Sequence, residues 1–238
     1  MLNSYLTQTQ NLLQSPAAPT TLYSTANLTT FINSARLQLA GESQSIRVLA
    51  TVPLTSAVQV VPFSSIVTGT AGVGGVFAVR QALVGIGSGQ ILLYPRSFEW
   101  FTRYYLNQVV PESALPRTWA QYAEGVSGSL YFYPIPDTPY TVQLDCVCEP
   151  IPLVDDTTVE AIPYPWQDAV PYYAAYLALM SAQRTADAGA MMQIYEMFVK
   201  RGRTISTPGV LPTNRPQVPD PTMTNKLGAS ASPSSGGQ

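Results

Sequence analysis

Two short helices are predicted at the start of the chain. Apolar residues recur at helical spacing within residues 2–13, and the prolines within residues 15–19 end this segment. A second helix is expected to begin near Ser24 or Thr25, either of which can cap it, and to end near Gly41. Its apolar face is formed by Leu28, Phe31, Ile32, Ala35 and Leu39. We expect the two helices to pack together.

From residue 45 the apolar positions alternate with a period close to two, which is typical of β-strands. The first such segments contain Ile46 and Val48, then Val58, Val60 and Phe63. Further strands, separated by Gly or Pro turns, are expected at about 75–85, 90–94, 118–123, 130–133 and 140–149. Residues 96–106 are rich in aromatic side chains and are expected to form a short helix. The middle of the chain is therefore predicted to be a small antiparallel sheet or sandwich.

The last third of the chain predicts a helical hairpin, whose first helix covers about 165–184. It opens with a proline, whose missing N–H costs nothing at the first helical position. Its apolar residues form two stripes, Val170, Tyr173, Ala174, Leu177 and Met180 or Ser181 on one and Ala169, Tyr172, Tyr176, Leu179 and Ala182 on the other. A helix that is apolar on two sides is buried on two sides, either in one core or in a core and an interface. The second alternative assigns Tyr172, Tyr176 and Leu179 to contacts between subunits.

The second helix of the hairpin covers about 186–203 and ends with Lys200, Arg201 and Arg203. Cations in a last helical turn interact favourably with the helix dipole, by roughly 0.3 to 1 kcal/mol each, and this effect alone can account for them. The functional alternative is that these side chains line a passage for DNA.

After the hairpin the chain becomes rich in proline, serine and glycine. Such a sequence cannot form a core of its own. Proline-rich chains favour extended conformations of about 3.1 Å per residue, so residues 206–221 could extend on the order of 50 Å. The tail is either an arm that binds a neighbouring protein, through a segment containing Pro208, Pro212, Pro216 and Pro219, or a segment without a partner.

These patterns together predict an α+β fold. Residues 1–44 and 162–204 supply an N-terminal helix pair and a C-terminal helical hairpin that form a helical bundle. Residues 45–161 are a central antiparallel β insertion with one short helix, and residues 205–238 are an extended arm.

The most informative feature of the composition is the low content of charged residues. Charged residues make up 11% of the chain, under half of the roughly 25% of typical soluble domains, whereas the hydrophobic fraction of 46% is ordinary. The surface is therefore either rich in Thr, Ser and Gln or largely covered by other subunits. The net charge of -2 argues against a dedicated nucleic-acid binder. No apolar run approaches the roughly 20 residues that span a bilayer, and the first residues lack the basic region of a secretory signal, so we expect a soluble product made in the cytoplasm.

The side chains offer little reactive chemistry. The chain has no histidine, which removes histidine-based triads, histidine-ligated metals and the usual proton shuttle near neutral pH. Cys146 and Cys148 lie one residue apart on a predicted strand and are expected to serve as small apolar packing residues. The glycine-rich segments 69–75 and 85–89 lead into strands rather than helices, so they read as a loop and a hairpin turn and not as phosphate-binding loops. No catalytic residue, cofactor or metal site is predicted, and the protein is not expected to be an enzyme.

Two groups of residues leave a carbohydrate-directed function open. Asp155, Asp156 and Glu160 form a short acidic segment that could supply paired carboxylates, although an exposed acidic loop is the simpler expectation. Aromatic residues that could stack on sugars, or equally serve a core, are Trp100, Tyr104, Tyr105, Trp119, Tyr122, Tyr131 and Tyr133.

Three stretches resemble the head-to-tail adaptor (connector) proteins of tailed bacteriophages, particularly those of short-tailed phages. The first is Leu28-Thr29-Thr30-Phe31-Ile32-Asn33-Ser34-Ala35 in the second helix. The second is the hairpin, with its opening from Ile162 to Ala178 and Gln193-Ile194-Tyr195-Glu196-Met197-Phe198. The third is Leu130-Tyr131-Phe132-Tyr133-Pro134-Ile135-Pro136 and the long strand after it, which resembles the β insertion of the family.

The resemblance implies a structural virion protein at the head-tail interface. Such proteins form a ring, typically of twelve copies, between the portal and the tail or nozzle proteins, and DNA passes through it without sequence-specific contacts. The arm would grip the portal. A large β region and a long tail are departures from the family pattern. A carbohydrate-binding or carbohydrate-active tail module and a DNA-contacting channel protein remain as alternatives.

Overall fold

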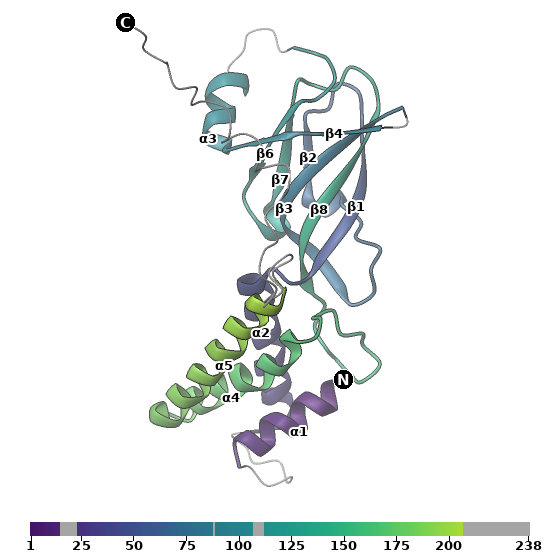
Figure 1. Cartoon of the computed structure of the whole chain (residues 1–238). Coiled ribbons are helices and arrows are strands. Elements are labelled where there is room, and N and C mark those ends of the chain that lie inside the picture. The colour runs from purple at the N-terminus through teal and green to yellow at the C-terminus, as the bar shows by residue number, and fades with distance from the viewer. Residues whose placement is uncertain (15–22, 88, 107–111, 207–238) are drawn as a thin grey trace, which may run out of the picture. The chain divides into compact units, whose positions relative to one another are not determined.

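A computed structural model describes residues 1–14, 23–87, 89–106 and 112–206 of the chain (Figure 1). It confirms the α+β class, with five α-helices and two four-stranded sheets in the described residues. The chain divides into two units, Met1–Arg203 and Thr204–Gln238, and the second is described only at Thr204–Ser206. The bundle arrangement and the domain boundaries at residues 44, 161 and 204 stay predictions. The four prolines assigned to the arm lie outside the described residues.

The two N-terminal helices form where the apolar spacing predicts them. Helix α1 (Leu2–Leu12) buries Leu2, Tyr5 and Leu6. Helix α2 (Thr25–Ser43) is capped by Ser24, whose side chain accepts a hydrogen bond from the Asn27 N–H at 3.2 Å. The inner face of α2 is fully buried at Leu28, Ile32, Ala35 and Leu39. Both helices contact helix α4 (Val170–Ser181) and each other.

The predicted start of the C-terminal hairpin is wrong by about one helical turn. Helix α4 begins at Val170 rather than at residue 165, and the proline in its first turn is Pro171. Residues Trp166–Ala169 form a separate 3-10 turn. The physical reason is that the side chain of Gln167 donates to the Ile162 carbonyl at 2.7 Å and the Trp166 N–H donates to Pro163, which holds this stretch as a tight turn.

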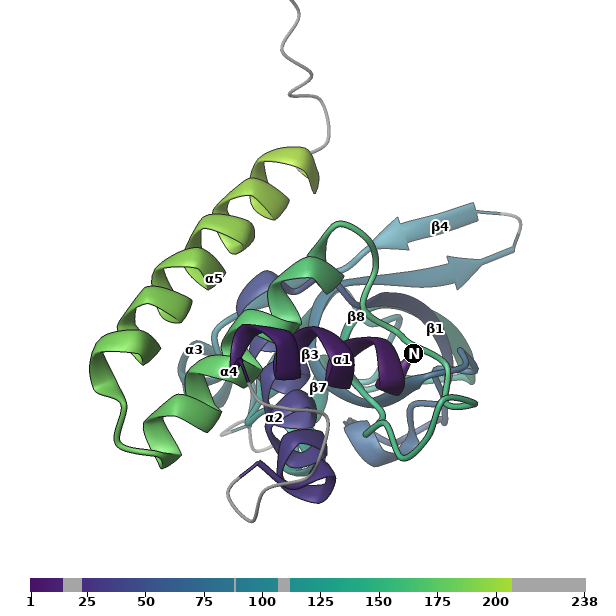
Figure 2. The same ribbon diagram turned by 90° about the horizontal axis from the view of Figure 1, so that it is seen from below.

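Helix α4 carries apolar residues around its circumference, and other helices of the same chain cover it on several sides. Helix α5 (Thr185–Ser206) packs along it through stacked Tyr172 and Phe198, whose ring centroids are 5.2 Å apart, and through Tyr173 and Tyr195 at 4.8 Å. Helices α1 and α2 contact α4 as well, and Figure 2 shows α5 running past α4 toward its end at Ser206. Much of the two-sided burial predicted for this helix therefore occurs within one core.

The β part contains two sheets with strand orders β1-β8-β3-β4 and β2-β7-β6-β5. The first is built from β1 (Arg47–Leu54), β3 (Val73–Ile86), β4 (Gly89–Leu92) and β8 (Tyr140–Pro150). The second is built from β2 (Val60–Pro62), β5 (Tyr94–Arg96), β6 (Thr118–Tyr122) and β7 (Ser129–Tyr133). Most of the expected strands are thus confirmed, but the one expected at 90–94 is divided between β4 and β5, which belong to different sheets, and Phe63 lies in a 3-10 turn. The turn at residues 85–89 is the predicted hairpin, since Ile86 pairs with Gly89.

The prediction of a purely antiparallel arrangement is wrong at one pair, because β5 and β6 run parallel. Parallel neighbours need a crossover connection, and the aromatic segment supplies it. Helix α3 (Phe98–Phe101) and the π-helical turn Thr102–Leu106 lie between the two strands. The short helix expected at residues 96–106 is confirmed at Phe98–Phe101 and forms part of this connection.

Strand β8 is one of the two inner strands of the first sheet and is buried over most of its length. Its two cysteines are free, fully enclosed and confirmed as packing residues. Burial raises the pKa of the Cys146 thiol to about 12 and that of Cys148 to about 11. Both thiols therefore stay protonated near neutral pH, as structural cysteines do.

A buried ion pair ties α2 to the segment that follows β8. Arg36 is fully buried, and its guanidinium binds the Glu160 carboxylate through Nε–Oε2 at 3.0 Å and Nη2–Oε1 at 2.8 Å. Its Nη1 donates to the carbonyl of Ile151 at 2.8 Å. Asn33 adds two hydrogen bonds to the backbone of Leu153, at 2.8 and 3.0 Å.

This arrangement corrects the expectation of a uniformly exposed acidic loop. Asp155 and Asp156 are exposed, as expected, but the Glu160 side chain is only 4% exposed. The buried Tyr5 lies beside it, and burial, reinforced by the Glu160 charge, raises the pKa of the Tyr5 hydroxyl far above its usual value. Glu160 is therefore a structural residue of the helical part.

We predict that Glu160→Ala lowers the free energy of unfolding by about 3–5 kcal/mol, because removing one partner leaves the Arg36 guanidinium buried without a counter-charge. The measurement is urea denaturation followed by circular dichroism. The matched control is Glu196→Ala, which removes an exposed carboxylate from α5 and should change the stability too little to resolve. Equal effects of the two variants would contradict this account of the ion pair.

Candidate functional site

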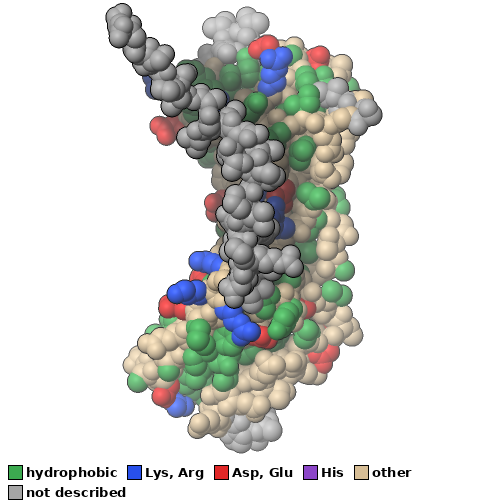
Figure 3. Space-filling model, in the orientation of Figure 1, with side chains coloured by type: hydrophobic (Ala, Val, Ile, Leu, Met, Phe, Trp, Pro, Cys, Tyr) green, Lys and Arg blue, Asp and Glu red, His purple; other side chains and the backbone are tan. Residues whose placement is uncertain are grey.

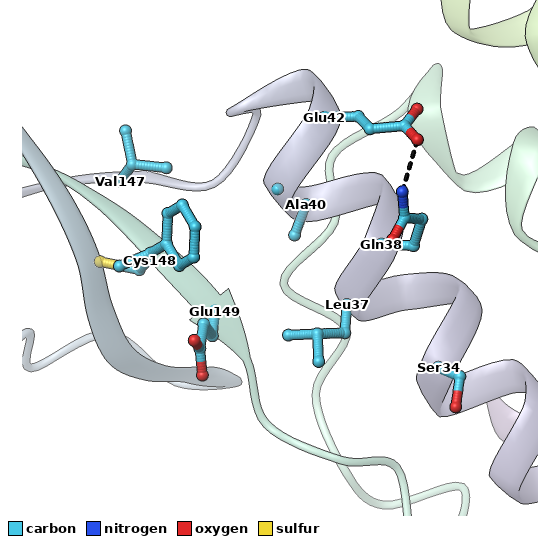
Figure 4. Close-up of a pocket in the computed structure, with 10 residues that line it drawn as sticks. Ser34, Leu37, Gln38, Ala40, Glu42, Val147, Cys148 and Glu149 are labelled. Atoms are coloured by element: carbon cyan, nitrogen blue, oxygen red, sulfur yellow. Dashed lines mark hydrogen bonds between the residues drawn. The ribbon is translucent and has the colours of Figure 1, made fainter. Parts of the chain in front are cut away.

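A groove of about 450 Å³ lies between α2 and the strands β3 and β8 (Figure 4). Its helical wall is formed by Ser34, Leu37, Gln38, Ala40, Gly41 and Glu42. Its strand wall is formed by Phe77, Val147, Cys148 and Glu149. Figure 4 shows Leu37 on the helix facing the strand that carries Glu149.

The groove is apolar and open because α2 uses its other face for the core. Leu37 lies away from the buried stripe of α2 and is 51% exposed. A Cβ atom at Gly41 would meet nothing within 4 Å, so the helix surface is free there. Val147 and Cys148, each 1% exposed, contribute buried apolar side chains on the strand side.

Carboxylates are the only charged groups among the described residues that line the groove. Glu149 lies on the strand side. Glu42 lies at the end of α2, where its carboxylate accepts hydrogen bonds from Gln38 Nε2 at 2.6 Å and from the Tyr195 hydroxyl at 3.0 Å. Burial, with the Glu42 charge as a second cause, raises the pKa of Tyr195 and keeps this hydroxyl a donor. The groove therefore favours an apolar partner that carries positive charge.

The C-terminal end of α5 is fixed beside this groove. Arg203 donates from Nη2 to the Glu42 carbonyl at 3.0 Å. Gly202 lies against Trp166 so closely that a Cβ atom would come within 2.7 Å of the indole ring. These contacts hold the last turns of α5 against α2 and the Trp166–Ala169 turn.

The structure places the three predicted DNA-contacting cations, Lys200, Arg201 and Arg203, on the exposed surface of α5. On the face seen in Figure 3, Lys and Arg side chains gather over the helical part. Because α5 continues to Ser206, only Arg203 lies in its last turn. The helix-dipole explanation is therefore wrong for Lys200 and Arg201.

The predicted interface residues on α4 differ in their exposure. Tyr172 and Tyr176 are partly exposed. The ring of Tyr172 stacks on Phe198, and the ring centroid of Tyr176 is 5.4 Å from that of Tyr173. Leu179 is 2% exposed and has almost no surface to offer a neighbour. The interface assignment stays a prediction, which now depends on the two tyrosines.

The aromatic residues considered for sugar stacking do not share one surface. Trp119 and Tyr133 are buried, and Tyr105 stacks on Tyr133 with centroids 3.7 Å apart. Of the aromatics considered, only Tyr104 and Tyr122 are exposed, at 50% and 51%. These rings mainly hold α3 against the second sheet, which counts against a carbohydrate platform.

The described ranges contain no cluster of acidic or cysteine side chains that could hold a metal ion. Within the same ranges no helix is long and apolar enough to cross a membrane.

Along the chain, helices precede and follow the β-rich part, and an exposed apolar groove lies between α2 and the strands. The chain matches the SU10 adaptor protein family over residues 4–211, which are 208 of its 238 residues. The chain belongs to this family. No curated protein matches it significantly. The match confirms the resemblance to phage head-to-tail adaptors.

As an SU10 adaptor protein, the chain is a structural and non-catalytic component of a phage virion. Membership of the family implies interaction with portal and tail components. The matched range runs from α1 to beyond α5 and so spans the β part. The groove was not predicted from the sequence, in which Leu37, outside the apolar stripe of its helix, is the one local signal for it.

We predict that Gly202→Ala and Gly189→Ala have opposite effects, although both place a better helix former in α5. At Gly189 a Cβ atom would meet nothing within 4 Å, so this change should stabilise the protein, by up to about 1 kcal/mol. At Gly202 the new methyl group would clash with Trp166, and the overpacking should lower stability by about 1–3 kcal/mol. Thermal and urea unfolding of the two variants provide the measurement. Stabilisation by both changes would refute the close packing at Trp166.

Proposed function

We propose that this adaptor forms a ring, of about twelve copies, between the portal and the tail of a bacteriophage. The ring seals the DNA channel and provides the platform for tail or nozzle proteins. The observation that carries this proposal is the family match over residues 4–211. The low content of charged residues, 11%, supports it, because a ring subunit needs little charged surface where neighbours cover it.

The mechanism that we propose is geometric. Helices α1, α2, α4 and α5 form the wall of the ring, and Tyr172 and Tyr176 contact the neighbouring subunit. The arm, with Pro208, Pro212, Pro216 and Pro219, binds the portal. The protein is made in the cytoplasm of the bacterial host and acts in the virion.

A second proposal concerns DNA. Lys200, Arg201 and Arg203 are exposed near the end of α5 and would contact the passing duplex through its phosphates, without reading sequence. A steep salt dependence of DNA binding by the assembled ring, lost on Arg201→Glu, would support this role.

The decisive experiment is native mass spectrometry of the purified chain, alone and after mixing with the portal protein of the same genome. We expect a species in which a fixed number of copies, close to the copy number of the portal, joins each portal. A chain that does not associate with the portal at any concentration would overturn the proposal.

We predict that deletion of residues 207–238 abolishes portal binding and leaves the fold intact. Met1–Arg203 is a compact unit with its own core, so its melting temperature should change little. The measurements are thermal unfolding and portal capture by native mass spectrometry. A truncated chain that binds the portal as tightly as the full chain would remove the arm from the mechanism.

We also predict that Tyr176→Asp prevents assembly into heads, because an uncompensated carboxylate in a subunit interface is costly to desolvate. Tyr94→Asp is the control, since Tyr94 is a tyrosine of the β part that is 64% exposed. Incorporation into heads is measured by complementation of an adaptor-deficient phage. Equal incorporation of both variants would exclude Tyr176 from the interface.

A further inference from the structure

The outer face of α5 combines an exposed apolar side chain with two cations. Met197, Lys200 and Arg201 are spaced three and four residues apart and so lie on one side of the helix. Met197 is 60% exposed, whereas Tyr195 and Val199, on the inner side, are 1% and 6% exposed. Methionine is flexible and polarisable, and exposed methionines suit binding surfaces that must adapt to a partner.

This concentration of charge is unusual for the chain. Only 12 of the 238 residues are Lys or Arg, yet two of them lie within one turn of Met197. Neither belongs to the last turn of α5, so the helix dipole does not explain them. Met197 and Arg201, four residues apart on one face, therefore form an exposed apolar and basic surface that suits an acidic, apolar partner.

The groove between α2 and the strands has the complementary character. Its surface is mainly apolar, with Leu37 exposed on the helical wall. Its charged residues, Glu42 and Glu149, are both acidic, and Figure 4 shows Leu37 and Glu149 on opposite walls. A helix face that carries Met197 and, one turn later, Arg201 would meet apolar surface and a carboxylate at the same time.

The two surfaces do not meet within one chain, because Met197, Lys200 and Arg201 remain exposed there. Within one chain, α5 is instead hydrogen-bonded to the end of α2 through Arg203. The complementary charges of the two surfaces therefore identify the occupant of the groove as α5 of a second copy of this chain.

We propose that the Met197–Arg201 face of α5 docks in the α2 groove of the neighbouring subunit, with Met197 against Leu37 and Arg201 paired with Glu149. The contact joins two different surfaces, and such heterologous contacts build closed rings when the rotation between subunits closes. This inference rests on the proposed ring and names the surfaces that hold it together. It also gives Lys200 and Arg201 a role other than DNA contact.

The test is a charge exchange in the full-length chain. Arg201→Glu and Glu149→Arg are each expected to weaken loading onto the portal at least tenfold, and the double variant should recover to within about threefold of the wild type. Loading is measured by titrating the adaptor against the portal of the same genome with native mass spectrometry. Thermal unfolding confirms that each variant is folded.

A second pair of variants tests the apolar contact. Met197→Asp and Leu37→Asp should each weaken loading at least tenfold. Val67→Asp should load like the wild type, since Val67 is also exposed, at 77%, but lies between β2 and β3 and belongs to neither surface.

The outcomes separate this contact from the other proposals. Normal loading of folded Arg201→Glu and Met197→Asp, or a double charge variant no better than the single ones, would overturn the contact and leave the ring intact. Normal loading combined with lost DNA binding by Arg201→Glu would assign the cations to DNA instead. If the wild type itself does not join the portal, the proposed function fails. The docking is then tested by self-association of the free chain in sedimentation equilibrium, where the exchanged pair must again restore what each single reversal removes.

Discussion

The fold depends on the buried ion pair between Arg36 and Glu160. The sheets end at β8, and the chain must return to the helices through residues 151–165, a stretch without helix or strand before the Trp166–Ala169 turn. Such a stretch has backbone groups that need partners, and α2 provides them through Asn33 and Arg36. Because two opposite charges are buried together, each is tolerated only in the presence of the other. The pair thereby makes α2 the common support of the helices and the β part.

Helix α2 can contact both the helices and the β part because its faces make different contacts. One face is fully buried against the other helices, and Arg36 leaves that face to reach the segment after β8. The face carrying Leu37 and Gly41 is left open and forms one wall of the groove. The groove is thus the space left between the outer face of α2 and the strands β3 and β8.

Much of this architecture could be predicted from residue periodicity, because helices and strands with one buried face repeat with their own periods. The strands from β6 to β8 and the helix capped by Ser24 lie close to where the pattern places them. What failed depended on contacts distant in sequence. The start of α4 is set by a tight turn that positions Trp166 against Gly202, and the burial of Glu160 is set by Arg36, 124 residues earlier. The local sequence around Trp166 or Glu160 does not reveal Gly202 or Arg36 as its contact. The groove could not be predicted for the same reason, because its walls come from three separate elements.

The packing of α5 has a mechanical consequence. Its contacts with the rest of the molecule are distributed along the helix, at Tyr195, Phe198 and Gly202, over about two helical turns. A load applied to the end of the helix and directed along its axis would act on these contacts together, in shear, instead of peeling them apart one at a time. Structures loaded in shear resist rupture better than structures that unzip. A helix anchored in this manner transmits a pull on its end to the core of the molecule through several contacts at once.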